Sequence, residues 1–265
     1  MQNRPTMHSL PAEPLDGYAA ILCDLDGCLI SGEHVYPGAR AFVAANRERL
    51  WIVSNNSSET AETLSARLTD LDLAIAPERM VLAGEQTVRL LAAERPGARV
   101  SIHAEPPLCA LAEELGLNAA PQRPDWVLLG RDTRLTLSRL AIILAQIEGG
   151  AELFVTNLDT AHPDPAGLPV PETGALLAAL KSCKPDLAFR SIGKPAPDLI
   201  EIALARAGVA PAKAVFIGDN LATDGEAARA VGLHFIHFLS SQLPLLHIRQ
   251  EETSARPNGA GRAPC

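Results

Sequence analysis

The sequence is poor in aromatic residues and in cysteines, and both shortages limit what the chain can be. Phe, Trp and Tyr make up 4% of its 265 residues, so a buried core has to be built from aliphatic side chains and alanine. The 5 cysteines are scattered, and none forms a C-x-x-C pair. An odd number of separate cysteines argues against a disulfide framework and against a zinc knuckle. We therefore expect reduced thiols and a cytoplasmic location.

Long apolar runs and blocks of basic residues are also missing. The longest apolar stretches, such as 140–147, are too short to span a bilayer. The N-terminal residues show no basic region followed by an apolar segment, so we expect no signal peptide. The formal net charge is −8 and no cluster of Lys or Arg stands out, so we expect neither a nucleic acid nor an anionic membrane as a partner.

What the chain does contain is an alternation of short apolar segments with helical patterns. Hydrophobic residues make up 47% of the sequence, enough to build a sizeable core. This βα alternation predicts an α/β fold with a doubly wound parallel sheet. The predicted strands of the main sheet cover residues 19–23, 50–53, 214–217 and 233–238.

A middle block of the chain has βα elements of its own, which predicts a second domain inserted into the first. We expect a discontinuous core domain of residues 15–81 and 185–248, an inserted domain of residues 82–184, and flexible termini, 1–14 and 249–265. Within the insert, the stretch 159–171 holds four prolines and one glycine and predicts a loop. Ser57 or Ser58 is the expected N-cap of a helix over 59–71.

Two carboxylates follow the first predicted strand. The apolar run ends at Asp24, and Asp26 and Gly27 come directly after it. Charged groups are costly to desolvate unless a metal ion or another partner compensates them. The carboxyl ends of strands in open α/β sheets are where active sites lie. A polar turn is the simpler alternative, and D-x-D-G also opens calcium-binding loops.

Polar groups follow other predicted strands as well. Ser54 ends the second strand, Asp219 ends a later one, and Lys194 lies in a Gly-Lys-Pro turn. Because the carboxyl ends of parallel strands share one edge of the sheet, these groups should meet there. Carboxylates suit Mg²⁺, and a lysine, a hydroxyl and free backbone N–H groups suit phosphoryl oxygens. A carboxylate can also take up a phosphoryl group as an aspartyl-phosphate, while a second acid moves the proton.

Together these motifs resemble the haloacid dehalogenase superfamily of phosphatases. The resemblance rests on Asp24-Leu25-Asp26, on Ser54, on Lys194 in Gly-Lys-Pro, and on the segment from Gly218-Asp219 to Asp224. The insert lies between Ser54 and Lys194, which is similar to the C2-capped, NagD-like branch of p-nitrophenyl-phosphatases, phosphoglycolate phosphatases and pyridoxal phosphatases. That branch implies a Rossmann-like core with a C2-type cap, Mg²⁺ as cofactor, and a small phosphorylated metabolite as substrate.

The resemblance also implies a role for each matching residue. Asp24 would be the nucleophile and a Mg²⁺ ligand, and Asp26 the general acid/base that also lends its backbone carbonyl to the metal. Ser54, Asn55 and Lys194 would bind the phosphoryl group. The remaining implied roles are metal binding by Asp219, support of the metal or of Lys194 by Asp224 and Asn220, and substrate selection by the cap residues Asn157, Asp159 and His162.

Several alternatives stay open from the sequence. Asp219 and Asp224 could cap a helix, Ser54 could be an N-cap, and His162 could be a solvated loop residue. A phospho-acceptor signalling domain, a dehalogenase and a non-hydrolytic relative are the competing functions. The position of Asn220 carries Arg in many relatives, so the detail of the last motif is uncertain. A homodimer through the cap is open as well, because members of this branch often pair in that way.

Overall fold

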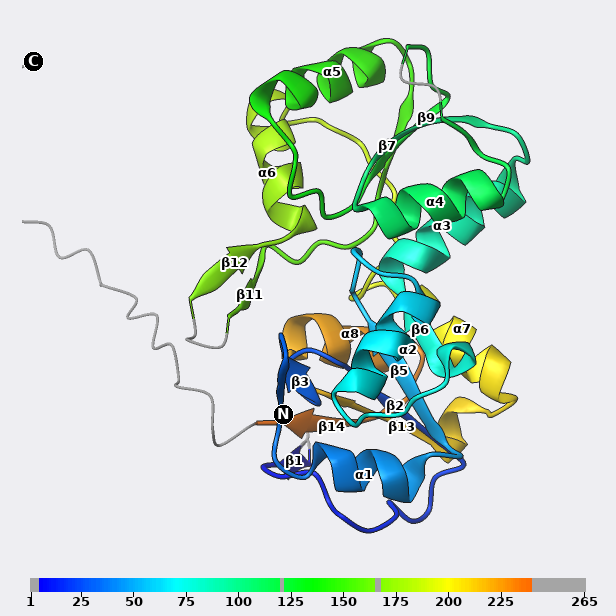
Figure 1. The fold of residues 1–265 in the computed structure, drawn as a ribbon, viewed down its shortest axis with the longest axis vertical. Helices are drawn as coiled ribbons and strands as arrows, with labels where there is room; N and C mark the ends of the chain where they lie inside the picture. Colours follow the sequence, from blue (N-terminus) through cyan, green and yellow to red (C-terminus); the bar gives the residue numbers. More distant parts are fainter. Residues whose placement is uncertain (1–4, 120–121, 165–167, 240–265) are drawn as a thin grey trace, which may run out of the picture.

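The computed structural model describes residues 5–119, 122–164 and 168–239, which form two α/β lobes stacked along the long axis of the molecule (Figure 1). The lower lobe is built on a 6-stranded sheet in which every strand is parallel to its neighbours. The predicted α/β fold with a parallel sheet is therefore confirmed. In spatial order the strands are β1 (Thr6–Met7), β14 (His234–Phe238), β13 (Ala214–Gly218), β2 (Ala20–Cys23), β5 (Leu50–Ser54) and β6 (Met80–Leu82).

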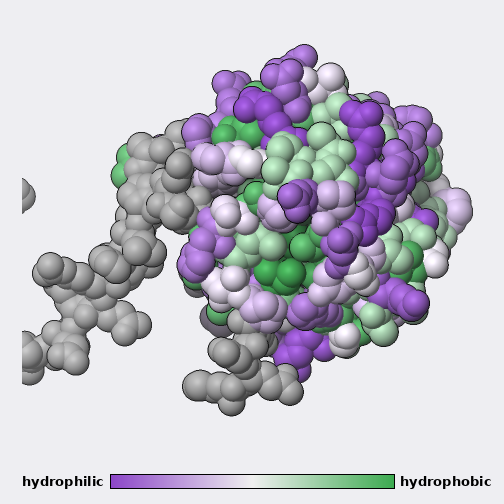
Figure 2. Space-filling view, turned by 90° about the horizontal axis from the view of Figure 1, so that it is seen from below, coloured by the Kyte–Doolittle hydropathy of each residue, from purple (hydrophilic) through white to green (hydrophobic). Residues whose placement is uncertain are grey.

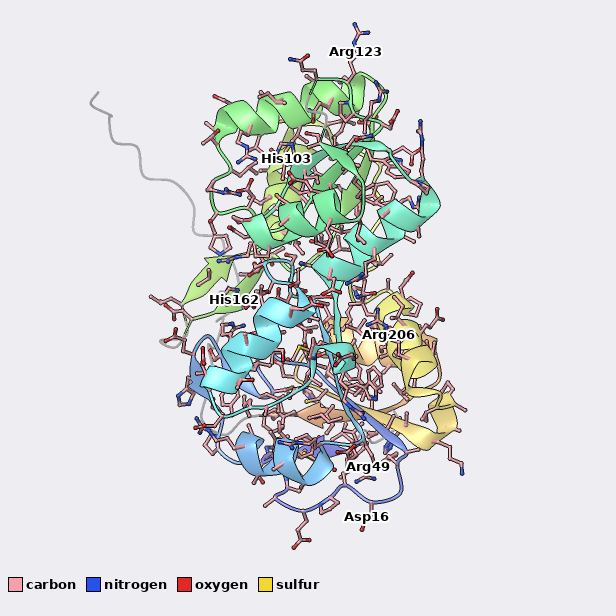
Figure 3. All side chains as sticks on the ribbon, turned by 45° about the vertical axis from the view of Figure 1, so that its right-hand side comes forward. Asp16, Arg49, His103, Arg123, His162 and Arg206 are labelled. Carbon is pink, nitrogen blue, oxygen red and sulfur yellow. The ribbon has the colours of Figure 1, made fainter. Side chains whose placement is uncertain are left out.

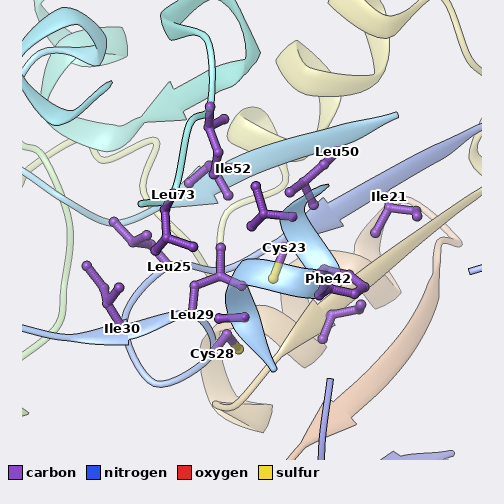
Figure 4. Packing of buried hydrophobic residues seen from close by; sticks show 14 of the residues in the cluster. Ile21, Cys23, Leu25, Cys28, Leu29, Ile30, Phe42, Leu50, Ile52 and Leu73 are labelled. Atoms are coloured by element: carbon purple, nitrogen blue, oxygen red, sulfur yellow. The ribbon is translucent and has the colours of Figure 1, made fainter. Parts of the chain in front are cut away.

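Both faces of this sheet are covered by helices, because successive side chains of a strand point to opposite faces. Ile21 and Cys23 pack into one apolar cluster, with α1 (Ala39–Asn46) and α2 (Ala61–Asp70). Figure 4 shows this cluster, with Cys23 and Cys28 among aliphatic side chains. Alternate strand residues pack on the other face with α7 (Asp198–Ala207) and α8 (Glu226–Ala230). Short turns at η1 (Pro77–Arg79), η2 (Pro211–Lys213) and η3 (Leu221–Gly225) precede β6, β13 and α8.

The upper lobe, which we call the cap, has a 4-stranded sheet and two pairs of helices. Its strands, in spatial order, are β10 (Glu152–Val155), β9 (Trp126–Leu129), β7 (Arg99–His103) and β8 (Asn118–Ala119). α3 (Ala83–Glu94) and α4 (Pro106–Glu114) cover one face, and α5 (Leu137–Glu148) and α6 (Thr173–Cys183) cover the other. Arg190, which follows the predicted end of the inserted domain at residue 184, forms an isolated β-bridge with Phe154 of the cap sheet. The predicted domain boundaries stay predictions.

Three local predictions differ from the structure. The stretch 159–171 is not only a loop, because β11 (Ala161–Pro163) and β12 (Pro169–Pro171) form an antiparallel hairpin below the cap (Figure 1). Its strands tolerate proline because each has a free edge that needs no N–H donor. The N-cap of α2 is Thr60, and not Ser57 or Ser58, because Thr60 and Thr63 form a reciprocal capping box. Thr6–Met7, in the lead-in predicted to be flexible, forms strand β1.

The surface agrees with the composition of the chain. Seen from below, hydrophilic residues surround a central group of hydrophobic ones on the core lobe (Figure 2).

Over the described ranges, no helix combines the length and the apolar character that a membrane span would need. Cys23, Cys28, Cys109 and Cys183 are free thiols, whereas Cys265 and the predicted flexible tail, 249–265, lie outside the described residues. A second small hairpin, β3 (Ile30–Ser31) with β4 (His34–Val35), follows the first strand-end turn.

Candidate active site

The strand ends of the core sheet bring the predicted polar groups together below the cap. Asp24 follows β2, Ser54 ends β5 and Asp219 follows β13, and these three strands are neighbours in the sheet. Asp24, Asp26, Lys194 and Asp219 line one cavity, and Asp24, Asp26, Ser54 and Asn55 line a second one that shares its first two residues. The shared sheet edge therefore places them around one site, as the parallel topology predicts.

Lys194 is the central cation of this site. Its side chain is buried, and Nζ lies 2.8 Å from Asp24 Oδ1 and 2.7 Å from Asp224 Oδ1. Nζ also donates a hydrogen bond to the backbone carbonyl of Val53 at 3.0 Å. Burial alone would lower the pKa of Lys194, but the two carboxylates outweigh it and raise that pKa above its ordinary value. Lys194 is therefore a fixed positive charge beside Asp24.

Three carboxylates surround this lysine and form a group that fits a divalent cation. Oxygen atoms of Asp24, Asp219 and Asp224 all lie within 4.8 Å of one another. Burial raises the pKa of Asp24 well above its ordinary value, against the opposing effect of Lys194. Burial, reinforced by Asp224, raises the pKa of Asp219 to about 7. One lysine does not balance the charge of three carboxylates. Carboxylate oxygens are the ligands that hard cations such as Mg²⁺ prefer, so the cluster fits such a cation.

Two glycines keep this carboxylate group compact. Gly27 has φ of +83°, and a Cβ there would lie 2.1 Å from Asp219 Oδ2. At Gly218 a Cβ would lie 2.4 Å from Asp224 Oδ2. The D-x-D-G and G-D sequences therefore need glycine for space beside the carboxylates, and Gly27 needs it for its positive φ as well.

Asp224 is held in place from two sides. Its Oδ1 contacts Lys194 Nζ, and its Oδ2 accepts a hydrogen bond from the backbone N–H of Asn220 at 3.1 Å. The Asn220 side chain in turn accepts from the backbone N–H of Ala222 at 2.9 Å and so caps the turn η3. Asp224 therefore supports Lys194 directly, and Asn220 shapes the loop that carries both acids.

Asp26 lies at the surface of the cavity, two residues beyond Asp24. The atoms around it exclude enough water to raise the pKa of its carboxyl group, while His162 and Arg67 oppose that rise. Its backbone forms an isolated bridge with Ile30, which anchors the turn. A carboxyl group with a raised pKa that faces a cavity can hold a proton and release it again.

Asn55 joins the core to the cap with its side-chain amide. Asn55 Oδ1 accepts from the backbone N–H of Lys194 at 2.8 Å, and Nδ2 donates to the Lys194 carbonyl and to Asp159 Oδ2, both at 3.0 Å. Asn157 Nδ2 donates to the Asn55 carbonyl at 2.8 Å. The neighbouring Ser54 is buried, and its Oγ accepts from the backbone N–H of Asn56 at 3.1 Å. Asn55, Asp159 and Asn157 therefore fix the position of the cap above Lys194.

The cap side of the cavity contains two residues that the sequence did not single out, Glu172 and Arg131. His162, at the level where the cap hairpin meets the core (Figure 3), contacts Glu172 with Nδ1 at 2.7 Å. Glu172 also forms an ion pair with Arg131, whose Nε lies 3.1 Å away. Glu172 follows β12 and Arg131 follows β9, so their proximity results from the packing of the cap and has no sequence signal.

Comparison with known proteins gives the family. Residues 21–118 match a family model described as haloacid dehalogenase-like hydrolase, and residues 191–252 match a related HAD-hydrolase-like model. Dihydroxyacetone phosphatase from Corynebacterium glutamicum is 31% identical over 80% of this chain and 78% of its own length. The chain belongs to the haloacid dehalogenase-like hydrolases. The predicted family and its hydrolase class are thereby confirmed.

Other members of this hydrolase family show the same likeness. D-glycerol 3-phosphate phosphatase from Mycobacterium tuberculosis is 34% identical over 80% of this chain, which spans only 60% of that relative. A crystal structure of the glycerol phosphate phosphatase from the same organism in complex with magnesium has a TM-score of 0.77 at 32% identity and covers 88% of this chain and 71% of its own. The 4-nitrophenylphosphatase from Thermotoga maritima reaches 0.79 at 26% identity and covers 90% and 92%.

Proposed function

We propose that this hydrolase is a Mg²⁺-dependent phosphomonoesterase that works through an aspartyl-phosphate on Asp24. The observation that carries the proposal is that the Lys194 ammonium group contacts Asp24, and that both residues line a cavity together with Asp26. A relative at 32% identity has been crystallised with magnesium, which supports the choice of metal. Asp24, Asp219 and the Asp26 backbone carbonyl would hold Mg²⁺, whose charge would stabilise the phosphoryl oxygens in the transition state.

In this mechanism each residue of the site has its own role. Asp24 attacks phosphorus, the ester P–O bond breaks, and Asp26 gives its proton to the departing oxygen. Asp26 then takes a proton from water, whose oxygen attacks the aspartyl-phosphate and releases inorganic phosphate. Lys194, the Ser54 hydroxyl and the Asn55 backbone bind the phosphoryl oxygens. The Asn55 side chain is engaged with Lys194 and Asp159, which supports a backbone contact for this residue.

The size of the cavity and its lining support a small hydrophilic substrate. The cavity lined by Ser54, Asn55 and Glu172 has a volume of about 310 Å³. In the described part of the chain, only Gly32 and Ala161 line it without a polar side chain. The relatives are named D-glycerol 3-phosphate phosphatase, dihydroxyacetone phosphatase and acid sugar phosphatase, and all three names refer to small hydroxylated compounds. We propose a small phosphorylated metabolite as the substrate, with Asn157, Asp159 and His162 shaping its site.

A phosphatase assay with a metal control tests this function. The purified protein should release inorganic phosphate from a panel of phosphomonoesters with Mg²⁺, lose activity with EDTA, and recover it on readdition of Mg²⁺. Asp24→Asn should abolish turnover while the circular dichroism spectrum stays unchanged. A single equivalent of bound phosphate without turnover would instead indicate a phospho-acceptor domain, and Mg²⁺-dependent turnover by Asp24→Asn would refute the mechanism. The cytoplasmic location and the homodimer through the cap stay predictions.

A further inference from the structure

Glu172 forms part of the cap wall of the cavity, and the mechanism above gives it no role. Its Oε1 contacts His162 Nδ1 at 2.7 Å and Arg131 Nε at 3.1 Å. These two partners come from β11 and from the loop after β9, so the carboxylate is held from two separate segments. A carboxylate restrained in this way is a preorganised hydrogen-bond acceptor, because little freedom is lost when a ligand binds.

One oxygen of Glu172 keeps its capacity to accept. The hydrogen bond that Glu172 makes within the described ranges involves Oε1, and no hydrogen bond there reaches Oε2. The side chain is 16% exposed, and burial raises its pKa although Arg131 and His162 oppose that rise. A mostly buried acceptor in a cavity wall gains most from a ligand that donates a hydrogen bond to it.

Glu59, a second carboxylate in the same cavity, shows the contrast. Arg67 donates to both of its oxygens, from Nε to Oε1 and from Nη2 to Oε2, each at 2.8 Å. Asn56 also donates to Oε2 of Glu59, at 2.9 Å. Glu59 is therefore already satisfied by the protein, whereas Glu172 is oriented but has an oxygen available.

We propose that Glu172 is a specificity-determining residue that accepts a hydrogen bond from a hydroxyl of the leaving group, and that Arg131 is its positioning residue. The inference rests on the proposed phosphatase function and narrows its substrates to phosphate esters of small neutral polyols. A leaving group that carries its own carboxylate is disfavoured, because its charge would face Glu172 in a cavity where Arg131 is already paired. Among the described residues that line the cavity, His162 alone has a ring on which a ligand could stack.

Three esters separate this role from a general effect on catalysis. Glycerol 3-phosphate has free hydroxyls, 3-phosphoglycerate replaces the terminal alcohol with a carboxylate, and p-nitrophenyl phosphate has no hydroxyl. In Glu172→Ala, kcat/KM for glycerol 3-phosphate should fall about tenfold to a hundredfold, mostly through KM, because a hydrogen bond to a charged acceptor is lost. The p-nitrophenyl phosphate value should stay within about threefold, since that ester lacks the donor. In Glu172→Gln, 3-phosphoglycerate should gain relative to glycerol 3-phosphate.

Two further sets of variants control the experiment. Arg131→Gln should show the same selective rise in KM for glycerol 3-phosphate, and Arg131→Lys should recover most of it because the charge beside Glu172 is retained. Glu94→Gln removes a carboxylate from an ion pair with Arg190 at the C-terminal end of α3, outside the cavity lining, and should leave kcat/KM for all three esters unchanged.

The outcomes distinguish the inference from the proposed function. If the wild-type protein hydrolyses none of the esters with Mg²⁺, both are wrong. If it hydrolyses them but the Glu172 variants change all three values by the same factor, the phosphatase function stands and the role of Glu172 is refuted. A selective loss for glycerol 3-phosphate, with p-nitrophenyl phosphate turnover intact as proof of folding, supports it.

Discussion

Lys194 Nζ lies 2.7 Å from Asp224 Oδ1, and both side chains are almost completely buried. The same ammonium group contacts Asp24 at 2.8 Å, so Asp224 holds the cation that the proposed nucleophile needs. A buried cation that loses one of its two carboxylate partners is left partly uncompensated. The consequences should appear both in stability and in turnover.

We predict that Asp224→Asn lowers the free energy of unfolding by about 3 kcal/mol, because one partner of a buried ion pair is removed. Urea unfolding monitored by circular dichroism measures this change. Asp72→Asn is the matched control, since Asp72 pairs with Arg40 at 3.7 Å and its side chain is 84% exposed. That control should cost less than about 0.5 kcal/mol. Equal effects of the two substitutions would contradict the role of Asp224.

Asp26→Asn should impair substrates with poor leaving groups more than those with good ones. Amide nitrogen cannot donate the proton as a carboxylic acid does, and an alkoxide needs that proton more than p-nitrophenolate does. We expect kcat/KM for glycerol 3-phosphate to fall about a hundredfold or more, and that for p-nitrophenyl phosphate to fall less. Because kcat/KM reports on the first chemical step, steady-state kinetics with both esters suffices. A uniform loss across both esters would speak against proton donation by Asp26.

Gly27→Ala should weaken Mg²⁺ binding, because the new methyl group would displace the Asp219 carboxylate. Gly17 provides the control, because its φ of +89° resembles the +83° of Gly27 but nothing lies within 4 Å of its Cβ position. Gly17→Ala should lower the free energy of unfolding by about 1 kcal/mol, which reflects the strained backbone alone, and Gly27→Ala should lower it further because its Cβ also overlaps Asp219. Only Gly27→Ala should also raise the Mg²⁺ dissociation constant, measured by isothermal titration calorimetry. Unchanged affinity in Gly27→Ala would show that Asp219 is not a ligand or that the loop moves freely.

The parallel order of the strands made the core of the site predictable. Asp24, Ser54 and Asp219 each directly follow or end a short apolar strand, and such strands meet at one edge of the sheet. Glu172 and Arg131 could not be predicted in this way, because 40 residues separate them and only the packing of the cap brings them together. The Thr60 cap was missed because nearby serines offer the same chemistry, and the capping geometry decides between them.

The buried His103 of β7 gives the fold a pH dependence that is independent of the proposed chemistry. Burial, aided by the charge of Arg139, lowers the pKa of His103 from 6.5 to about 4, while Asp132 opposes the shift. Between these two values the unfolded chain binds more protons than the folded one, so stability falls as the pH falls. Its contribution is complete above about pH 6.5 and is lost on the way to about pH 4.

We therefore expect His103 to account for about 2 kcal/mol of the stability lost between pH 7 and pH 5. Urea unfolding at both pH values measures how much unfolding free energy the wild type and His103→Gln each lose between pH 7 and pH 5. The difference between these two losses is the contribution of His103, and it does not depend on what the substitution costs at pH 7. NMR titration of the imidazole in the wild-type protein checks the cause directly, because the His103 resonance should move only near pH 4. An imidazole that titrates near 6.5 in the folded protein would show that protonation of His103 does not oppose folding.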